Sequence, residues 1–153
     1  MPNHLCRHAR HIRIGTLNIA KQYNPTGITE IMRDMDMDVF AIQEPPQGSL
    51  TSPRTLIHNK LLTYNARIVD SDYCLTIIDA LLAPAVVHTH ITAQGRCQCI
   101  TLQTRTAHLT IINIYDVQHN NTNSCIPAVT NAIATISSKF SDISFIFVGD
   151  FQA

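Results

Sequence analysis

The sequence predicts an α/β fold whose sheets are partly parallel and partly antiparallel. A strand–helix–strand succession fills residues 12–44, and short strand candidates separated by turns fill residues 64–115. Strands joined by a helix are expected to be parallel neighbours, whereas strands joined by tight turns run antiparallel. The length of 153 residues, without an internal repeat or linker, favours one domain, or part of one, over residues 12–153.

The first strand is expected over residues 12–19, where alternate side chains share a face by the two-residue period of a strand. Asn18 stands near its end, and a buried amide needs hydrogen-bond partners. A turn at residues 24–27 is followed by apolar residues at helical spacing. The inward stripe of this helix is predicted to be Ile28, Ile31, Met32 and Met35.

The second strand, at residues 38–44, is apolar from its second residue until its last two, as expected of a strand covered on both faces. The two prolines that follow end it, because proline has no N–H to donate. A Ser-Pro pair at residues 52–53 indicates the start of a helix that ends near Leu62. Five further strands are expected at residues 64–69, 73–79, 86–92, 96–103 and 108–115.

The strongest helical pattern of the chain lies at residues 124–140, where Ser124 is placed to cap the first turn. Its apolar stripe is predicted to be Ile126, Val129, Ile133, Ile136 and Phe140. A buried strand is expected at residues 143–148, and Gly149 and Asp150 follow it directly. A carboxylate therefore stands at the end of this strand, as Glu44 does at the end of the second.

The bulk composition is globular and excludes a disordered or membrane-spanning chain. Hydrophobic residues make up 45% and charged residues 14%, and no segment approaches the ~20 apolar residues of a membrane span. Eleven basic and eleven acidic side chains cancel, so any nucleic-acid binding has to be local. No secretory signal is visible, and the five cysteines contain no CxxC pair, so we expect an intracellular, reducing location.

Two features keep alternative interpretations open. Residues 1–11 are expected to form a flexible N-terminal arm. This arm carries three histidines at helical spacing, so metal binding or phosphate contact by a basic arm are alternatives. Cys97 and Cys99 share one face of a strand and are interpreted as two small buried hydrophobic residues, with metal binding as the alternative.

Polar side chains close four of the predicted strands: Asn18, Glu44, Asn113 with Tyr115, and Asp150. One carboxylate at a strand end is most simply a solvated end, but four polar ends in an otherwise apolar sheet indicate a shared edge that carries a site. Two carboxylates with amide oxygens form a hard-oxygen environment that suits Mg²⁺ or Mn²⁺. With a phenol alongside, this set favours metal-assisted hydrolysis of a phosphate ester.

The same strand ends form four short motifs: Thr-Leu-Asn at residues 16–18, Ile-Gln-Glu at 42–44, Asn-Ile-Tyr at 113–115 and Gly-Asp-Phe at 149–151. In this order they resemble the motifs of the endonuclease/exonuclease/phosphatase superfamily, and above all the apurinic-endonuclease-like domain of non-LTR retrotransposons. The resemblance runs from about Ile12 to the last residue. It implies a sandwich of two β-sheets with helices on the outer faces, of which this chain is an incomplete, N-terminal part.

The resemblance also implies a role for each strand-end residue. Glu44 would bind the catalytic Mg²⁺ or Mn²⁺, with Asn18 beside it. Tyr115 would contact the scissile phosphate, Asp150 would orient or activate the attacking water, and Asn113 would support the site from within its strand. The implied substrate is nucleic acid, DNA most of all, and a retroelement origin would place the protein in the nucleus.

Two departures from the family pattern bear on activity. Gln152 stands where the family has asparagine; it is one methylene longer and still able to hydrogen-bond phosphate, so we include it in the site. The family's C-terminal Ser-Asp-His type motif does not occur, and the later histidines sit in no matching motif: His88, His90, His108 and His119. We therefore expect low or no hydrolysis by this chain, and self-association through an uncovered sheet face.

Two other functions fit the same residues. One is another phosphatase or phosphodiesterase of the superfamily, directed at phosphoinositides, sphingomyelin or RNA tails, because loops outside the motifs set the substrate. The other is a non-catalytic α/β interaction module in which the strand-end polar groups are purely structural. In that case the binding of Mn²⁺ would not depend on Glu44.

Overall fold

The computed structural model describes residues 11–20, 25–45, 65–116 and 124–151, and these form two four-stranded mixed sheets. The first sheet has the order β1-β2-β4-β3, with β1 at Ile14–Asn18, β2 at Val39–Gln43, β3 at Arg67–Asp70 and β4 at Cys74–Ile78. The second has the order β5-β6-β7-β8, with β5 at Val86–Thr92, β6 at Cys97–Gln103, β7 at His108–Asp116 and β8 at Ile143–Phe151. The predicted two-sheet architecture is confirmed.

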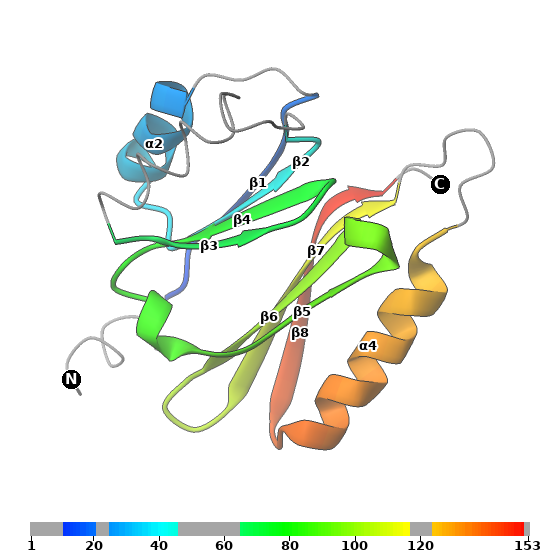
Figure 1. The fold of residues 1–153 in the computed structure, drawn as a ribbon. Coiled ribbons are helices and arrows are strands. Elements are labelled where there is room, and N and C mark those ends of the chain that lie inside the picture. Colours follow the sequence, from blue (N-terminus) through cyan, green and yellow to red (C-terminus); the bar gives the residue numbers. More distant parts are fainter. Residues whose placement is uncertain (1–10, 21–24, 46–64, 117–123, 152–153) are drawn as a thin grey trace.

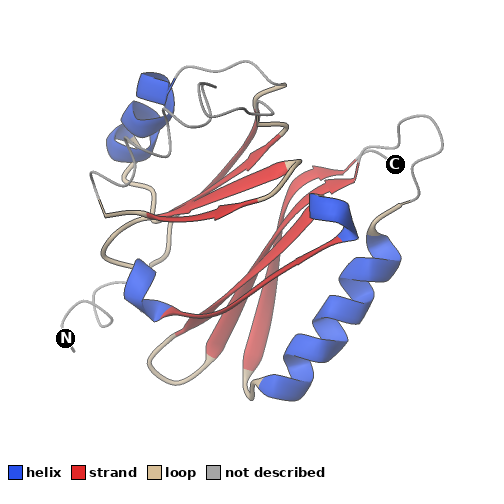
Figure 2. Cartoon of the chain, viewed as in Figure 1, coloured by secondary structure: helices blue, strands red, loops and turns tan. Residues whose placement is uncertain are grey.

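Two helices lie on the outer sides of the two sheets, so the sheets face each other between them (Figures 1 and 2). Helix α2, Pro25–Asp34, covers the first sheet, and helix α4, Ile126–Lys139, covers the second. Two short 3₁₀ turns, η1 at Ala83–Ala85 and η2 at Ala93–Gly95, flank β5.

In each sheet a parallel pairing brings the carboxyl ends of two strands together. Strands β1 and β2 are parallel, as are β7 and β8, whereas the other neighbours are antiparallel. In the parallel pairs Asn18 lies opposite Gln43, and Tyr115 lies opposite Asp150. The prediction that the first two strands end at the same edge is therefore confirmed.

The core has three layers, because successive side chains of a strand point to opposite faces. Phe40 and Ile42 of β2 pack with Ile28 and Met32 of α2 in the first layer. The layer between the sheets contains Val39, Ile78, Leu82, Ile100, Leu102 and Ile111. The layer under α4 contains Cys97, Cys99, Ile112, Ile114, Val129 and Ile136. Every strand in the middle of a sheet is thus covered on both faces.

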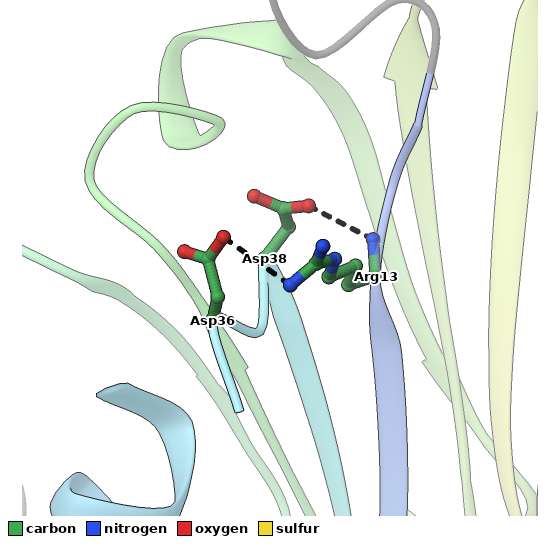
Figure 3. Close-up of polar contacts among 3 residues, drawn as sticks. All are labelled: Arg13, Asp36 and Asp38. Carbon is green, nitrogen blue, oxygen red and sulfur yellow. Dashed lines mark hydrogen bonds and ion pairs between the residues drawn. The ribbon is translucent and has the colours of Figure 1, made fainter. Parts of the chain in front are cut away.

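Figure 3 shows how the opposite end of the β1–β2 pair is held. The backbone N–H of Arg13 donates to Asp38 Oδ2 at 2.8 Å, and the N–H of Asp38 donates to the Arg13 carbonyl at 2.9 Å. The Arg13 guanidinium also approaches Asp36 at 3.3 Å, but both side chains are exposed, so this pair contributes at most about 1 kcal/mol. The reciprocal contacts to Asp38 fix where the parallel pairing starts.

Several predicted boundaries and faces differ from the structure. Strand β8 continues through Asp150 to Phe151, three residues beyond its predicted end. The predicted stripe of α2 is wrong at two positions, because Ile31 and Met35 are exposed. Met35 lies beyond the end of the helix at Asp34, and within the helix Ile28 and Met32 are the stripe residues that reach the core.

The stripe of α4 is likewise shifted. Ile126 is exposed, and Ala132 is buried in its place beside Val129 and Ile136. The helix begins at Ile126, where the hydroxyl of Ser124 accepts the Ile126 N–H at 3.2 Å. The predicted helix after residue 52 and residues 1–10 of the predicted arm lie outside the described residues.

The cysteine prediction is confirmed for the described pair. Cys97 and Cys99 are fully buried, with their sulfurs 4.0 Å apart, and both pack under α4. Within the described ranges, neither helix combines the length and the hydrophobicity needed to cross a bilayer.

Strand β8 forms one edge of the second sheet, and no other described strand pairs with its outer side. Three large apolar side chains on this strand are exposed: Ile146, Phe147 and Phe151. An apolar edge strand of nine residues is an open template for pairing with another chain.

The start of α4 is fastened by a buried carboxylate at the end of β7. Asp116 accepts the backbone N–H of Cys125 at 2.9 Å and the hydroxyl of Ser124 at 3.1 Å. Burial alone would raise the pKa of Asp116, but these hydrogen bonds, together with the nearby charge of Arg96, lower it below its ordinary value. The charged carboxylate therefore stabilises the fold.

The lowered pKa of Asp116 predicts how stability depends on pH. Its contribution is present above the unfolded-state pKa near 3.8 and is lost as the pH falls from there through the lower folded-state pKa. Asp116→Asn is expected to lower the unfolding free energy by about 1 kcal/mol at pH 7 and by less at pH 3. Urea unfolding between pH 7 and pH 3 checks this, with the exposed Asp72→Asn as control. A deficit independent of pH contradicts the assignment.

Candidate functional site

Three predicted site residues meet where the two sheets come together at their strand ends. The amide nitrogen of Asn18 donates to Glu44 Oε1 at 3.1 Å and to Asp150 Oδ2 at 2.7 Å. These residues come from the end of β1, the residue after β2, and β8. One neutral amide thus joins two carboxylates that belong to different sheets.

The orientation of the Asn18 amide is fixed by its other atom. Its oxygen, Oδ1, accepts the backbone N–H of Ala20 at 2.8 Å, so the nitrogen is the atom that faces the carboxylates. A flipped amide would place two acceptors against each other at both carboxylates and lose the bond to Ala20. In this arrangement Asn18 acts as a donor between the two acids.

Glu44 has a backbone conformation that few residues with a side chain adopt. Its φ is +52°, in the left-handed region, which costs about 1 kcal/mol for a residue other than glycine. Its N–H donates to the carbonyl of Tyr73, the residue before β4, at 3.0 Å. The abrupt turn directs the carboxylate away from the line of β2 and toward Asn18, and residues in such conformations cluster at functional sites.

Tyr115 lies beside both acids and is only 3% exposed. Burial raises the pKa of its phenol, and so do a hydrogen bond with Glu44 and the negative charges of Glu44 and Asp150. The phenol is therefore protonated at neutral pH and able to donate a hydrogen bond. Its ring is stacked on that of Tyr73, with centroids 5.8 Å apart and planes inclined by 9°.

Gly149 is the residue that lets β8 approach β7 closely before Asp150. Its φ is +137°, and a Cβ at this position would collide with the carbonyl oxygen of Ile114. Only glycine fits such a backbone without strain. The Gly-Asp pair thus has a steric reason: the glycine permits the contact that brings Asp150 opposite Tyr115.

A buried inter-sheet amide network lies directly behind these residues and consists of Gln43, Asn113, Thr76 and Gln98. Gln43 Nε2 donates to Asn113 Oδ1 at 2.8 Å, and Asn113 Nδ2 donates to Thr76 Oγ1 at 3.1 Å. Thr76 in turn donates to Gln98 Oε1 at 2.6 Å. The chain of bonds alternates between the sheets, because Gln43 and Thr76 belong to the first and Asn113 and Gln98 to the second.

All four members of this network are at most 1% exposed, and each has more than one partner. Gln43 also donates to Thr16 Oγ1 at 3.0 Å, and Gln98 donates to the carbonyl of Cys74 at 2.9 Å. The sequence prediction included Asn113 as a support but missed Gln43, Thr76 and Gln98 in this role. The available signal was a polar residue at a buried position of each strand, and it is clearest in β4, where Thr76 is the one polar residue among Cys74–Ile78.

The two acids and the phenol are chemically suited to a divalent cation. Glu44 and Asp150 place carboxylate oxygens within 3.1 Å of the same nitrogen, with only a neutral donor between them. A hard cation that takes oxygen ligands would neutralise this charge, and Glu44 offers it a carboxylate oxygen. Among the described residues, no three His, Cys, Asp or Glu side chains gather as a metal site. The predicted site residue Gln152 lies outside the described residues.

The fold of this chain is similar to the folds of known proteins, whereas its sequence has no match. No family model and no curated protein matches this chain. Among solved structures, TDP2 from Caenorhabditis elegans matches with a TM-score of 0.64 at 13% identity, over 91% of this chain and 46% of that one. The AP endonuclease LMAP from Leishmania major matches with a TM-score of 0.62 at 14% identity, over 91% and 54% of the two chains.

A third likeness is to the endonuclease domain of TRAS1, a telomere-specific non-LTR retrotransposon, with a TM-score of 0.56 at 14% identity. It covers 91% of this chain and 59% of that one. An endonuclease/exonuclease/phosphatase family protein from Leptotrichia buccalis is matched as well. The two sheets with their helices thus form part of the fold of the endonuclease/exonuclease/phosphatase superfamily, and the chain spans about half the length of these structures.

The amide network predicts a large stability loss when one member is removed. Asn113→Leu keeps the volume but leaves the amide of Gln43 and the hydroxyl of Thr76 short of a buried partner, so about 2–4 kcal/mol of unfolding free energy is expected to be lost. Urea unfolding measures this, with the exposed helix residue Asn131→Leu as the matched control. The double variant Gln43→Leu/Asn113→Leu is expected to lose less than the sum of the single losses. Equal stability of the Asn113 and Asn131 variants contradicts the prediction.

Proposed function

We propose that this chain is part of a metal-dependent phosphodiesterase of the endonuclease type, which hydrolyses phosphodiester bonds of nucleic acid, DNA above all, with Mg²⁺ or Mn²⁺ as its metal. The observation that carries the proposal is the meeting of Glu44 and Asp150 at one amide nitrogen. Paired carboxylates beside a protonated phenol suit phosphoryl chemistry. The fold likeness to an AP endonuclease and to a retrotransposon endonuclease domain supports this reaction class.

Each side chain has a distinct part in the proposed reaction. Glu44 holds the metal, with Asn18 beside it as donor to both acids. Tyr115, whose pKa is raised, keeps its proton at neutral pH and donates it in a hydrogen bond to a phosphate oxygen. Asp150 orients the attacking water and accepts its proton. When bound, the metal supplies charge neutralisation at the phosphoryl oxygens.

Two further residues assist from outside the reacting atoms. Asn113 supports the site by joining the ends of the two sheets through Gln43. Gln152 is two residues after Asp150 in the sequence, and its side-chain amide provides another hydrogen-bond donor to phosphate. Both side chains are neutral amides, so they contribute hydrogen bonds and not charge.

Hydrolysis by these 153 residues alone is proposed to be slow. The sequence contains no match to the superfamily's Ser-Asp-His type motif. His88 and His108 pack against Phe140 at the end of α4. We infer a retroelement origin from the motif order and from the likeness to the TRAS1 domain.

The first test of this function is metal binding. Wild-type chain is expected to bind Mn²⁺ in calorimetry, and Glu44→Gln is expected to weaken binding by at least about tenfold, because it removes a charged ligand without changing the shape of the side chain. Glu30→Gln, at an exposed glutamate of α2, is the matched control and is expected to bind as the wild type does.

Equal Mn²⁺ affinity of the wild type and Glu44→Gln would mean that the strand-end groups are structural, as in a non-catalytic interaction module. Cleavage is tested separately with Mg²⁺ on plasmid and abasic DNA. Rapid nicking that Glu44→Ala abolishes would contradict slow hydrolysis while supporting the endonuclease function. Turnover of phosphoinositides or RNA tails but not DNA would select the alternative substrates.

The exposed edge of the second sheet predicts self-association. Phe147 of β8 is 47% exposed beside the similarly exposed Ile146 and Phe151. Phe147→Lys is expected to reduce association, because charged side chains on an edge strand oppose strand pairing. Sedimentation velocity over a range of concentrations checks this, with Ile126→Lys, at a 49% exposed apolar residue of α4, as control. A wild-type monomer at all concentrations contradicts it.

A further inference from the structure

Tyr73 is a residue of the site edge to which the proposed reaction assigns no role, yet it contacts two residues that have one. Its ring stacks on Tyr115, and its backbone carbonyl accepts the N–H of Glu44 at 3.0 Å. Its own N–H donates to the carbonyl of Gly95 at 3.3 Å, which ties it to the turn before β6. Tyr73 is thus held by the second sheet while it holds Glu44 of the first.

The stack restricts the ring of Tyr115. Centroids 5.8 Å apart with planes 9° apart are an offset stacked arrangement, within the range of ~4.5–7 Å that aromatic pairs prefer. Tyr115 is buried and Tyr73 is half-buried, so the Tyr73 ring covers one face of its neighbour. A covered ring cannot swing in its own pocket without breaking the stack, so its phenol stays directed at Glu44, with which it shares a hydrogen bond.

The backbone contact restricts Glu44 at the same time. Glu44 has a φ of +52°, and such a conformation persists only where the surroundings hold it. The hydrogen bond to the Tyr73 carbonyl is a contact of this kind, and it is made by the residue whose ring orients the phenol. Displacement of Tyr73 would therefore move the carboxylate and the phenol together.

We propose that Tyr73 is a positioning residue of the strand-end site, which sets the Tyr115 phenol and the Glu44 carboxylate relative to each other by its ring and its carbonyl. The proposal rests on the proposed function only in naming the groups thus set as a metal ligand and a phosphate contact. The flat ring of Tyr73 restricts Tyr115, and the hydroxyl of Tyr73 is not needed for this. We therefore expect Tyr73→Phe to preserve the position of the Tyr115 phenol and Tyr73→Leu to disturb it.

The test is ¹⁹F NMR of the 153-residue chain labelled with 3-fluorotyrosine. The sequence contains four tyrosines and no tryptophan, and Tyr115→Phe assigns the Tyr115 signal. Tyr73→Phe is expected to preserve a single Tyr115 signal, whereas Tyr73→Leu is expected to split or broaden it because the ring takes several orientations; a shift alone reports only the lost ring current of Tyr73. Phe140→Leu is the matched control, since it removes a half-buried ring whose described ring contacts are with His88 and His108.

Addition of Mn²⁺ alone separates this proposal from the proposed function. In the wild type and in Tyr73→Phe the metal is expected to broaden the Tyr115 signal, and in Tyr73→Leu the broadening is expected to be lost or reduced. A single Tyr115 signal of unchanged width in Tyr73→Leu, whatever its shift, or the same splitting or broadening in Phe140→Leu, overturns the positioning role. Absence of broadening in the wild type contradicts the metal site, while the metal-free spectra still decide the role of Tyr73.

Discussion

The hydrogen bond between Gln43 and Asn113 is the contact on which the arrangement of the two sheets depends. An interface made only of aliphatic side chains tolerates small displacements, because dispersion and burial have little directional preference. A fully buried amide pair does not, since a shift that breaks the 2.8 Å bond takes the Gln43 donor away from the buried Asn113 oxygen. The network from Gln43 to Gln98 therefore fixes one offset of the sheets, and the strand ends meet because that offset is fixed.

The site is then a consequence of two parallel pairings and one interface. The register of β1 on β2 brings Asn18 opposite Gln43, and the register of β8 on β7 brings Asp150 opposite Tyr115. Each pair alone lies at the end of its own sheet. The buried network joins the two ends, and the left-handed turn at Glu44 closes the remaining distance. Groups far apart in the sequence are thus positioned by rigid strands, which is what a site for metal or phosphate needs.

The sequence predicted the strands and their polar ends because both are local properties. An apolar run that stops at an acid, as at Glu44, can be recognised from a few residues. The inner face of α2 could not be predicted, since periodicity alone does not tell that the helix ends before Met35. The role of Tyr73 could not be predicted either, because its stacking on Tyr115 arises only when β4 and β7 come together across the interface.

The amide of Asn18 lies between the two acids, but its orientation is not the one that a metal ligand would have. The motif places an amide between the acids, and an amide oxygen would be a cation ligand. The structure turns the nitrogen to both carboxylates, because Ala20 occupies the oxygen. As a donor to both, the amide offsets part of the repulsion between the two carboxylates. Rotation of the amide on metal binding would give up the Ala20 contact in exchange for a ligand bond. The Ala20 contact therefore couples the orientation of the Asn18 amide to the conformation of the chain just after β1.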